Sequence, residues 1–432
     1  MAANRSIHDR LIDLRREFHS HPEPGWLEFE TTARIVTELQ RIGVDELYVG
    51  ADIYDSDDRM GVPDQAVVDR WRSRAMARGI DEDVLADMGD GVTGALGVIR
   101  GGPGPTVGLR VDIDALRIVE SEDADHRPAA KQFRSTTEES MHACGHDAHA
   151  TIGLGVAEAV NRAEFGGTLK VFFQPAEEGA RGGHAVAGSR HLADVDDLIA
   201  LHVGLGHPTG EVVAGCEKIL ATSKLEVEFT GEAAHAGRAP NEGSNAVLAA
   251  ASAIQNVHAI PRHADGATRI NVGLVSGGDA INIVPSSAGI AIDIRGETTE
   301  LMEYVRERAV RICRRAGEMY GCSVAVETIG QAPRVDSDPE LSEYVYRAAR
   351  ANPRVTTPLR RSDFGASEDA THLMRRVKDE GGRATYAIVG TDHPGEHHTP
   401  RFDIDEQSLT IGVEVIAETI LELGDHSENG SA

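Results

Sequence analysis

Short apolar segments typical of buried β-strands alternate with longer helical segments along most of this chain. The strand candidates are ALGVIRG (95–101), TVGLRVDID (106–114), TLKVFFQPAEEG (168–179), DLIALHVG (197–204) and ATYAIVG (384–390). Helical stretches such as 149–163 and 405–423 separate them. This alternation predicts an α/β fold with a mostly parallel central sheet. Because such sheets place their chemistry just past the carboxyl ends of strands, we expect DID, QPAEE and LHVG to lie at the functional site.

Two segments interrupt this rhythm. Residues 51–92 are acidic with a central helical pattern, and they separate two strands that a short turn would connect. They are either a surface excursion or a lid or wall near the site. Residues 218–330 have their own strand, helix, strand, strand, helix, strand order, which predicts an inserted ferredoxin-like α+β domain. We therefore predict a catalytic domain from 1–217 and 331–424, a satellite domain at 218–330 and a disordered tail at 425–432.

Composition limits the partners of the chain. Its 432 residues carry a net charge of −27, and five of its 43 basic residues are lysines. Nucleic acid, itself an anion, is therefore not an expected partner. The spread of acidic residues and the scarcity of lysine predict adaptation to high salt, which screens the self-repulsion of the surface.

The compartment can also be predicted. No apolar run approaches the roughly 18 residues that cross a bilayer, and the first residues are charged instead of forming a signal core. The four cysteines form no CxxC pair. We therefore expect no membrane association, a cytoplasmic location, and thiols that are free or bound to metal.

One stretch, MHACGHDAH at 141–149, concentrates candidate metal ligands. Cys144 and His146 are two residues apart, a spacing that lets both side chains reach the same metal ion or ions. The spacing does not match a structural zinc finger. A lone C-x-H pair is a weak signal, so the prediction depends on ligands from other segments.

Those further ligands follow strand candidates far away in the chain. Glu177 and Glu178 end a buried strand, and adjacent buried carboxylates need a positive partner. One of them can bind metal while the other acts as a general base. His202 follows another strand, and His397 and His398 lie near the end of the chain. Ligands from distant segments favour a catalytic site over a local structural one.

Six motifs in this order extend the argument: MHACGHDAH, QPAEEG, LHVG, GEAAHAGRAPNEGSNAV, GGDAINIVP and HHTPRFDIDE. Together they resemble the amidohydrolase family of hippurate hydrolases, aminoacylases and indole-acetyl-amino-acid hydrolases. The segment at 51–92 and SDFGASEDATHLM make the chain most similar to the A subunits of p-aminobenzoyl-glutamate hydrolases. The resemblance implies a zinc-peptidase-like catalytic domain with an inserted dimerisation domain.

The resemblance also implies roles for particular residues. It implies two divalent metal ions, zinc or manganese with cobalt or nickel as alternatives, held by Cys144 as the bridging ligand and by His146, Glu178, His202 and His398. Glu177 is then the general base. Asp112 is implied to orient His146, although a capping role in the DID turn is an equal alternative. His142, His149 and His397 are expected to be neighbours of the ligands and not ligands.

For the substrate, the resemblance points to the inserted domain. His235 is implied to stabilise the oxyanion in the active site of a partner subunit, which requires a homodimer. Asn282 and Arg295 are implied to hold the substrate carboxylate, and an arginine fork suits that task. A turn role for Asn282 and a surface role for Arg295 stay open.

We therefore expect a metal-dependent amidohydrolase acting on an N-acyl or N-aroyl amino acid, with p-aminobenzoyl-glutamate as the leading candidate. A metallo-exopeptidase or dipeptidase is the alternative, and a second, different hydrolase subunit is a further possible partner. A non-catalytic binding subunit is disfavoured because Glu177 and all five expected ligands are present. The sequence contains no G-x-S-x-G motif, so nothing in it indicates a serine nucleophile.

Overall fold

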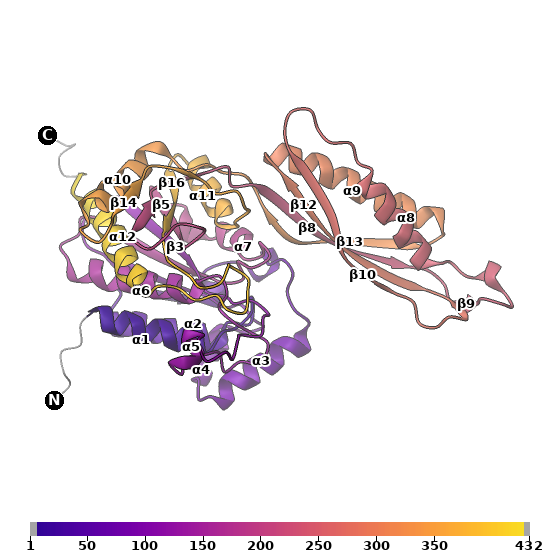
Figure 1. Cartoon of the computed structure of the whole chain (residues 1–432), viewed down its shortest axis with the longest axis horizontal. Coiled ribbons are helices and arrows are strands. Elements are labelled where there is room, and N and C mark those ends of the chain that lie inside the picture. Colours follow the sequence, from indigo (N-terminus) through magenta and orange to yellow (C-terminus); the bar gives the residue numbers. More distant parts are fainter. Residues whose placement is uncertain (1–6, 427–432) are drawn as a thin grey trace. The chain divides into compact units, whose positions relative to one another are not determined.

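The computed structural model describes residues 7–426, and its contacts divide the chain into two compact units (Figure 1). The first unit contains the described residues up to Glu217, then Val335–Phe364 and the described residues from Asp369 onward. The second contains Lys218–Arg334 and Gly365–Glu368. None of the described helices is long and apolar enough to span a membrane.

An eight-stranded sheet forms the centre of the first unit, in the order β1-β2-β4-β3-β5-β16-β6-β14. The strands are β1 (Glu46–Val49), β2 (Ala95–Arg100), β3 (Thr106–Asp112), β4 (Thr168–Gln174), β5 (Asp197–Val203), β6 (Glu211–Val213), β14 (Thr357–Leu359) and β16 (Arg383–Val389). A separate parallel pair joins β7 (Cys216–Glu217) to β15 (Ser362–Asp363). Strands β4, β3, β5 and β16 run parallel, whereas β1, β2 and β6 add antiparallel pairings. The predicted α/β class with a mainly parallel centre is confirmed.

Helices cover both faces of this sheet. They are α1 (Ile7–Ser20), α2 (Phe29–Ile42), α3 (Gln65–Ala77), α4 (Glu82–Asp87), α5 (Arg127–Ala130), α6 (His146–Arg162), α7 (Gly183–Ala187), α10 (Pro339–Ala351), α11 (Ala370–Asp379) and α12 (Gln407–His426). Helix α6 packs on β3, β4 and β5, and α1, α2 and α12 pack against α6, whereas α11 packs on β5 and β16 beside α7. The central strands are buried on both sides, which explains their almost continuous apolar sequences.

The segment at 51–92 forms α3 and α4 in the first unit. Trp26 donates its indole N–H to the Met60 carbonyl at 2.8 Å, and Arg181 donates to the Gly61 carbonyl at 3.2 Å. Arg181 also donates from Nε to the Glu178 carbonyl at 2.8 Å. The segment is therefore tied by hydrogen bonds to the loop that follows β4.

The second unit is a four-stranded antiparallel sheet in the order β10-β12-β8-β13, with two helices on one face (Figure 1). Its elements are β8 (Ala221–Thr230), β9 (Ala234–His235), α8 (Ala246–His258), β10 (Thr268–Gly277), β11 (Ile283–Val284), β12 (Ser287–Gly296), α9 (Thr299–Met319) and β13 (Ser323–Ala332). The main strands and helices follow the expected β-α-β-β-α-β order. Strand β13 passes the predicted boundary at residue 330. At the end of the chain, α12 includes residues 425 and 426 of the predicted tail, and 427–432 lie outside the described residues.

A buried ion network attaches α1 to the start of α6. The imidazole of His19 donates from Nδ1 to Asp147 at 2.7 Å and from Nε2 to Glu120 at 2.9 Å. The buried guanidinium of Arg15 lies 2.8 Å from Asp147 and 2.9 Å from Asp403. Burial and Arg15 oppose the charged form of His19, but the bonds to Asp147 and Glu120 outweigh them and raise its pKa to about 9. His19 is therefore a buried cation at neutral pH.

This network predicts a pH dependence of stability. The pKa of His19 is raised from 6.5 to about 9, so its contribution of about 3 kcal/mol is complete below pH 6.5 and disappears as the pH rises through 9. His19→Gln should lower the free energy of unfolding at pH 6 by more than it does at pH 9.5. Urea unfolding of both proteins at the two pH values measures this, and an equal loss at both would contradict the assignment.

Candidate metal centre

Three neighbouring parallel strands deliver the polar residues of the site to one edge of the large sheet. Strand β3 ends at Asp112, β4 ends at Gln174 and β5 ends at Val203, and β3 lies between the other two. The segments that follow these strands contain DID, QPAEE and LHVG, as expected from the sequence. Parallel strands end on the same side, so segments far apart in the sequence meet here.

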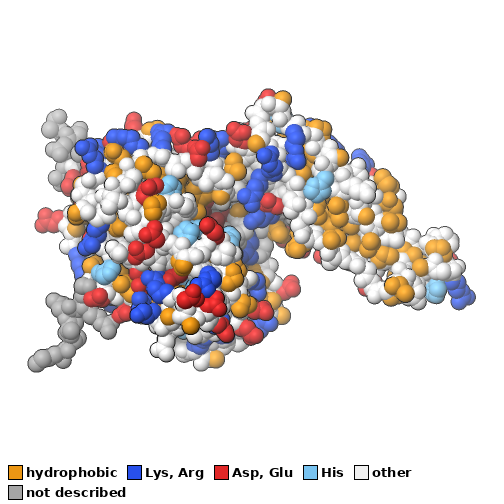
Figure 2. All heavy atoms as spheres, in the orientation of Figure 1, with side chains coloured by type: hydrophobic (Ala, Val, Ile, Leu, Met, Phe, Trp, Pro, Cys, Tyr) orange, Lys and Arg blue, Asp and Glu red, His pale blue; other side chains and the backbone are white. Residues whose placement is uncertain are grey.

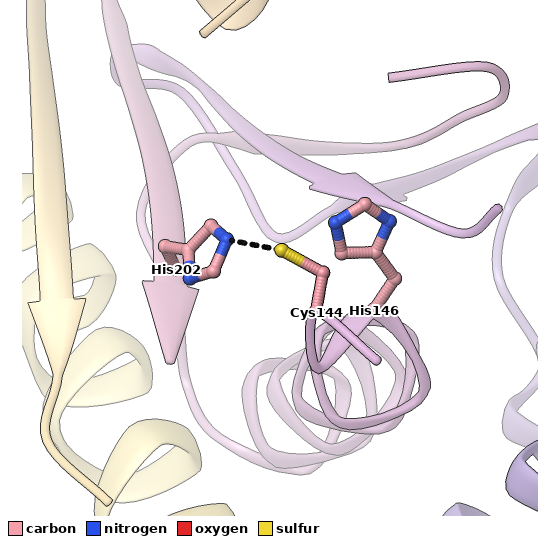
Figure 3. A group of neighbouring side chains, drawn as sticks. All are labelled: Cys144, His146 and His202. Atoms are coloured by element: carbon pink, nitrogen blue, oxygen red, sulfur yellow. Dashed lines mark hydrogen bonds between the residues drawn. The ribbon is translucent and has the colours of Figure 1, made fainter. Parts of the chain in front are cut away.

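Cys144 and His146 enter this edge from the turn that starts α6. Gly145 lies between them with a φ of 88°, and an added Cβ would stand 2.4 Å from the Val203 side chain. Glycine therefore permits both the left-handed turn and the close approach to β5. Figure 3 shows Cys144 between His146 and His202, with its sulfur pointing at the His202 ring.

The candidate ligand atoms form two groups that share Cys144. One group contains Cys144, His146 and His202, the other Cys144, Glu178 and His398, and the atoms within each group lie within 4.8 Å of one another. Cys144 Sγ is 3.5 Å from His202 Nε2, and Glu178 Oε1 is 3.5 Å from His398 Nε2. Bonds of about 2.0–2.3 Å to a tetrahedral ion separate its ligands by roughly 3.3–3.8 Å. These spacings fit atoms that share a cation.

The hydrogen bonds of the two buried histidines orient them for this task. His202 Nδ1 donates to the Val203 carbonyl at 2.7 Å, so the lone pair of Nε2 points at Cys144. His146 Nδ1 lies 3.3 Å from Asp114 Oδ1, and its buried Nε2 has no hydrogen-bond partner among the described residues. A buried nitrogen without a donor or acceptor is costly unless a cation completes it. In both rings Nε2 is therefore the nitrogen that is available to a cation.

The electrostatics of the cluster also favour a cation. Burial, followed by the carboxylate of Glu178, raises the pKa of the Cys144 thiol well above its usual value. Burial, followed by the charge of His149, holds the pKa of His202 well below its usual value. A divalent ion would reverse the first effect, because a coordinated thiol is deprotonated, and it requires the neutral imidazole that the second effect provides.

The carboxylates behind the ligands differ from the sequence prediction. Asp112 was expected to orient His146, but its Oδ1 lies 2.5 Å from His149 Nδ1 and 3.7 Å from His146 Nδ1. Asp114, two residues later, is the nearer carboxylate to His146. The reason is the strand geometry: Asp112 is still within β3, whereas Asp114 lies beyond its end.

Asp114 is a residue of the candidate site that the sequence analysis missed. Its two carboxylate oxygens accept the backbone N–H groups of Glu177 and Glu178, each at 3.0 Å. It therefore fixes the loop that carries both glutamates as well as the ring of His146. The second aspartate of the DID turn was the available signal. Arg110 was also missed; it is fully buried and donates to Asp112 and Asp369 at 2.8 and 2.9 Å.

The three histidines that were expected not to be ligands lie around the cluster. His149 Nε2 accepts the Val203 N–H at 2.9 Å, and Nδ1 donates to Asp112, so neither nitrogen has a free lone pair. His397 Nε2 accepts the Leu205 N–H at 3.1 Å. His142 is buried, and burial lowers its pKa to about 3. The first two contacts fit the expectation that these rings support the ligands.

The substrate candidates lie in the second unit. His235 is exposed in β9, which pairs with β11, and the Asn282 carbonyl accepts the Ala236 N–H at 3.0 Å. The structure therefore brings His235 and Asn282 together. Arg295 lies at the other end of strand β12, about 27 Å of extended chain from Ser287. Its Nε is 3.0 Å from Asp293. Within one copy of the chain, Arg295 and Asn282 are thus too far apart to grip one small carboxylate.

Comparisons with known proteins point to one family. The profile of the peptidase family M20/M25/M40 matches residues 108–422. The chain is 41% identical to an indole-3-acetyl-aspartic acid hydrolase of Enterobacter agglomerans over 421 residues, which are 96% of each chain. It is 40% identical to a p-aminobenzoyl-glutamate hydrolase subunit of Escherichia coli over 420 residues, again 96% of each. The crystal structure of an aminobenzoyl-glutamate utilization protein from Klebsiella pneumoniae superposes with a TM-score of 0.83 at 36% identity and covers 96% of both chains.

Proposed function

We propose that this chain, which belongs to the peptidase family M20/M25/M40, is a metal-dependent amidohydrolase that cleaves the amide bond of an N-acyl or N-aroyl amino acid. The observation that carries the proposal is the pair of ligand groups that share the Cys144 sulfur, with Glu177 directly beside Glu178. A structural metal site closes its coordination with local ligands, whereas this cluster gathers ligands from four distant segments and includes an adjacent carboxylate.

The chain would supply proton transfer to the reaction. Two divalent ions, when bound, polarise the scissile carbonyl and lower the pKa of a water molecule. A carboxylate oxygen of Glu177 lies within 4.8 Å of candidate ligand atoms of His146 and Glu178, which supports a role for Glu177 in taking the proton of the attacking water. It then returns the proton to the leaving amine. Asp114 holds the backbone of Glu177 during both transfers.

We assign p-aminobenzoyl-glutamate as the leading substrate. The two relatives named above are a hydrolase of indole-3-acetyl-aspartic acid and a subunit of a p-aminobenzoyl-glutamate hydrolase, and both names contain an aromatic acyl group joined to an acidic amino acid. His235 of the partner subunit is proposed to stabilise the oxyanion, with Asn282 beside it. Arg295 is proposed to bind the substrate carboxylate, a role that its guanidinium geometry suits.

The composition of the chain and the donor atoms of the candidate ligands support a choice of metal ion, salt concentration and compartment. Nitrogen, sulfur and carboxylate donors suit zinc, and manganese is the second candidate, with cobalt or nickel as alternatives. The net charge of −27 supports folding in high salt. All four cysteines are free thiols, which supports a reducing, cytoplasmic compartment.

A homodimer formed by the second unit is part of this proposal. Strand β10 is an edge of its sheet, and Leu274 and Val275 on it are 72% and 67% exposed. Figure 2 shows hydrophobic side chains gathered on one face of this unit. An apolar edge strand of this length favours pairing with another strand. The name of the relative from Escherichia coli, which describes one subunit of a hydrolase, supports a different polypeptide as an alternative partner.

A metallo-exopeptidase or dipeptidase is the alternative activity, because the same centre hydrolyses any amide that the surrounding pocket admits. The two activities differ on the acyl side of the scissile bond. A peptide substrate presents an amino group there, whereas an aroyl substrate presents a ring. Supplying a dipeptide and an aroyl amino acid together and measuring which of the two is cleaved therefore separates the two activities.

The first prediction concerns the substrate. Purified protein in molar KCl should release p-aminobenzoate from p-aminobenzoyl-glutamate after chelation and reloading with zinc or manganese, and the chelated protein should not. Folded, metal-loaded protein that releases none would reject this substrate and return the choice to other N-acyl amino acids and dipeptides. A rate that does not respond to chelation would reject the metal mechanism.

A second prediction separates the base from the ligands. Glu177→Gln should keep both metal ions and lower kcat by about 10²–10⁴-fold, because it removes proton transfer and not coordination. Glu178→Gln should instead lose metal. Metal content by plasma emission spectrometry and initial rates measure the two effects. Loss of metal from the Glu177 variant would show that Glu177 is itself a ligand.

A third prediction tests the dimer. Leu274→Asp should convert a dimer into a monomer, and activity should fall with it, because His235 of the partner subunit is removed from the site. Met76→Asp, a change of an exposed residue on α3, is the matched control and should stay dimeric and active. Light scattering after size-exclusion chromatography gives the mass. A fully active monomer would overturn the role of His235.

A further inference from the structure

We propose that His397 is a positioning residue that donates an N–H···S hydrogen bond from Nδ1 to the sulfur of Cys144. This hydrogen bond stabilises the negative charge of the thiolate that the two ligand groups share. The inference rests on the proposed function, because it requires Cys144 to be a metal ligand. It assigns a role to a histidine that is neither a ligand nor the general base.

The protonation of His397 follows from its backbone contact. Its Nε2 accepts the N–H of Leu205 at 3.1 Å, so Nε2 carries a lone pair and no proton. A neutral imidazole then has its proton on Nδ1. That nitrogen lies 3.7 Å from Cys144 Sγ, within the range of a hydrogen bond to sulfur. The ring is therefore a donor toward the sulfur and has no free lone pair for a metal.

The loop after β5 is shaped to hold this ring. Gly204 has a φ of 81° and Leu205 a φ of 53°, and the second value is rare for a residue with a side chain. An added Cβ on Gly204 would stand 2.8 Å from His397 Nε2. The other side of the ring packs on Phe402, with the ring centres 4.6 Å apart. Backbone strain at Leu205 thus accompanies a fixed donor direction.

His149 shows the same arrangement with a backbone N–H two residues earlier in the chain. Its Nε2 accepts the Val203 N–H at 2.9 Å, and its Nδ1 donates to Asp112 at 2.5 Å. The segment 203–205 therefore locks two histidines in the same tautomer through alternate N–H groups. One of the two locked donors faces a carboxylate, and the other faces Cys144.

This donor has a defined physical effect. If the Cys144 thiolate held the cations, an N–H donor would stabilise it further by lowering the energy of the sulfur electrons. Removing the donor should bring the sulfur-to-metal charge-transfer band to lower energy and weaken metal binding by about 10-fold, the lower end of the effect of such outer partners. Neither quantity depends on turnover.

The test uses the full-length protein loaded with cobalt(II), whose thiolate charge-transfer band reports on the sulfur. His397→Phe keeps a ring and removes the donor, and the band should move to longer wavelength. His397→Asn restores an N–H near the position of Nδ1, and the band should return toward that of the wild type. His393→Phe is the matched control, because its ring lies 5.3 Å from that of His397 without being a partner of Cys144, and it should not move the band.

The outcomes separate the inference from the proposed function. Metal content and the melting curve of each variant show that it is folded and loaded. An unchanged band in folded, loaded His397→Phe overturns the inference even if the enzyme hydrolyses p-aminobenzoyl-glutamate. A shifted band that Asn restores supports it even if that substrate is not cleaved. A wild-type cobalt protein without a thiolate band overturns both the inference and the assignment of Cys144.

Discussion

The sulfur of Cys144 lies where the two groups of candidate ligands meet, and the surrounding structure is arranged around that point. Burial and nearby carboxylate charge keep the thiol protonated in the absence of a cation. A bound divalent ion would remove this cost, and the buried Nε2 of His146 would be one of the atoms that hold it. The site is therefore a set of groups whose burial is unfavourable without a cation and would become favourable with one.

Three buried aspartates hold the segments around the site in place. Asp114 accepts the backbone N–H groups of both glutamates. Asp112 accepts a hydrogen bond from His149, and Asp147 accepts one from His19 of α1. Each of these aspartates is fully buried and lies on β3, just beyond it, or in the first turn of α6. Because a buried charge is expensive to leave unpaired, moving any of these elements would break a charged hydrogen bond. Asp114 thus orients the candidate ligands directly, whereas Asp112 and Asp147 fix the structure around them.

The second unit has a different physical character. Its helices and sheet enclose their own apolar core. His235 and Asn282 are exposed outside this core, and Arg295 is half-buried. His235 and Asn282 are brought together by the short pairing of β9 with β11, whereas Arg295 lies at the far end of β12. One copy of the chain therefore cannot bring Arg295 and Asn282 to the same substrate carboxylate. This separation agrees with a site to which two subunits contribute, which is the arrangement proposed for the oxyanion.

Much of this protein is determined by the sequence itself, because strand periodicity and motif order are local properties. Buried strands with polar residues at their ends indicated the α/β class and placed Glu177, Glu178 and His202 at one edge, and the MHACGHDAH stretch indicated Cys144 as a candidate ligand. Which carboxylate supports which histidine is a different matter, since it depends on where β3 ends and on the distance between side chains 30 or more residues apart. Tertiary structure alone separated Asp112 from Asp114 and locked His397 through Leu205. Backbone N–H groups at the end of β5 and just after it determine which nitrogen of each ring carries the proton, and this contact cannot be inferred from the spacing of residues in the sequence.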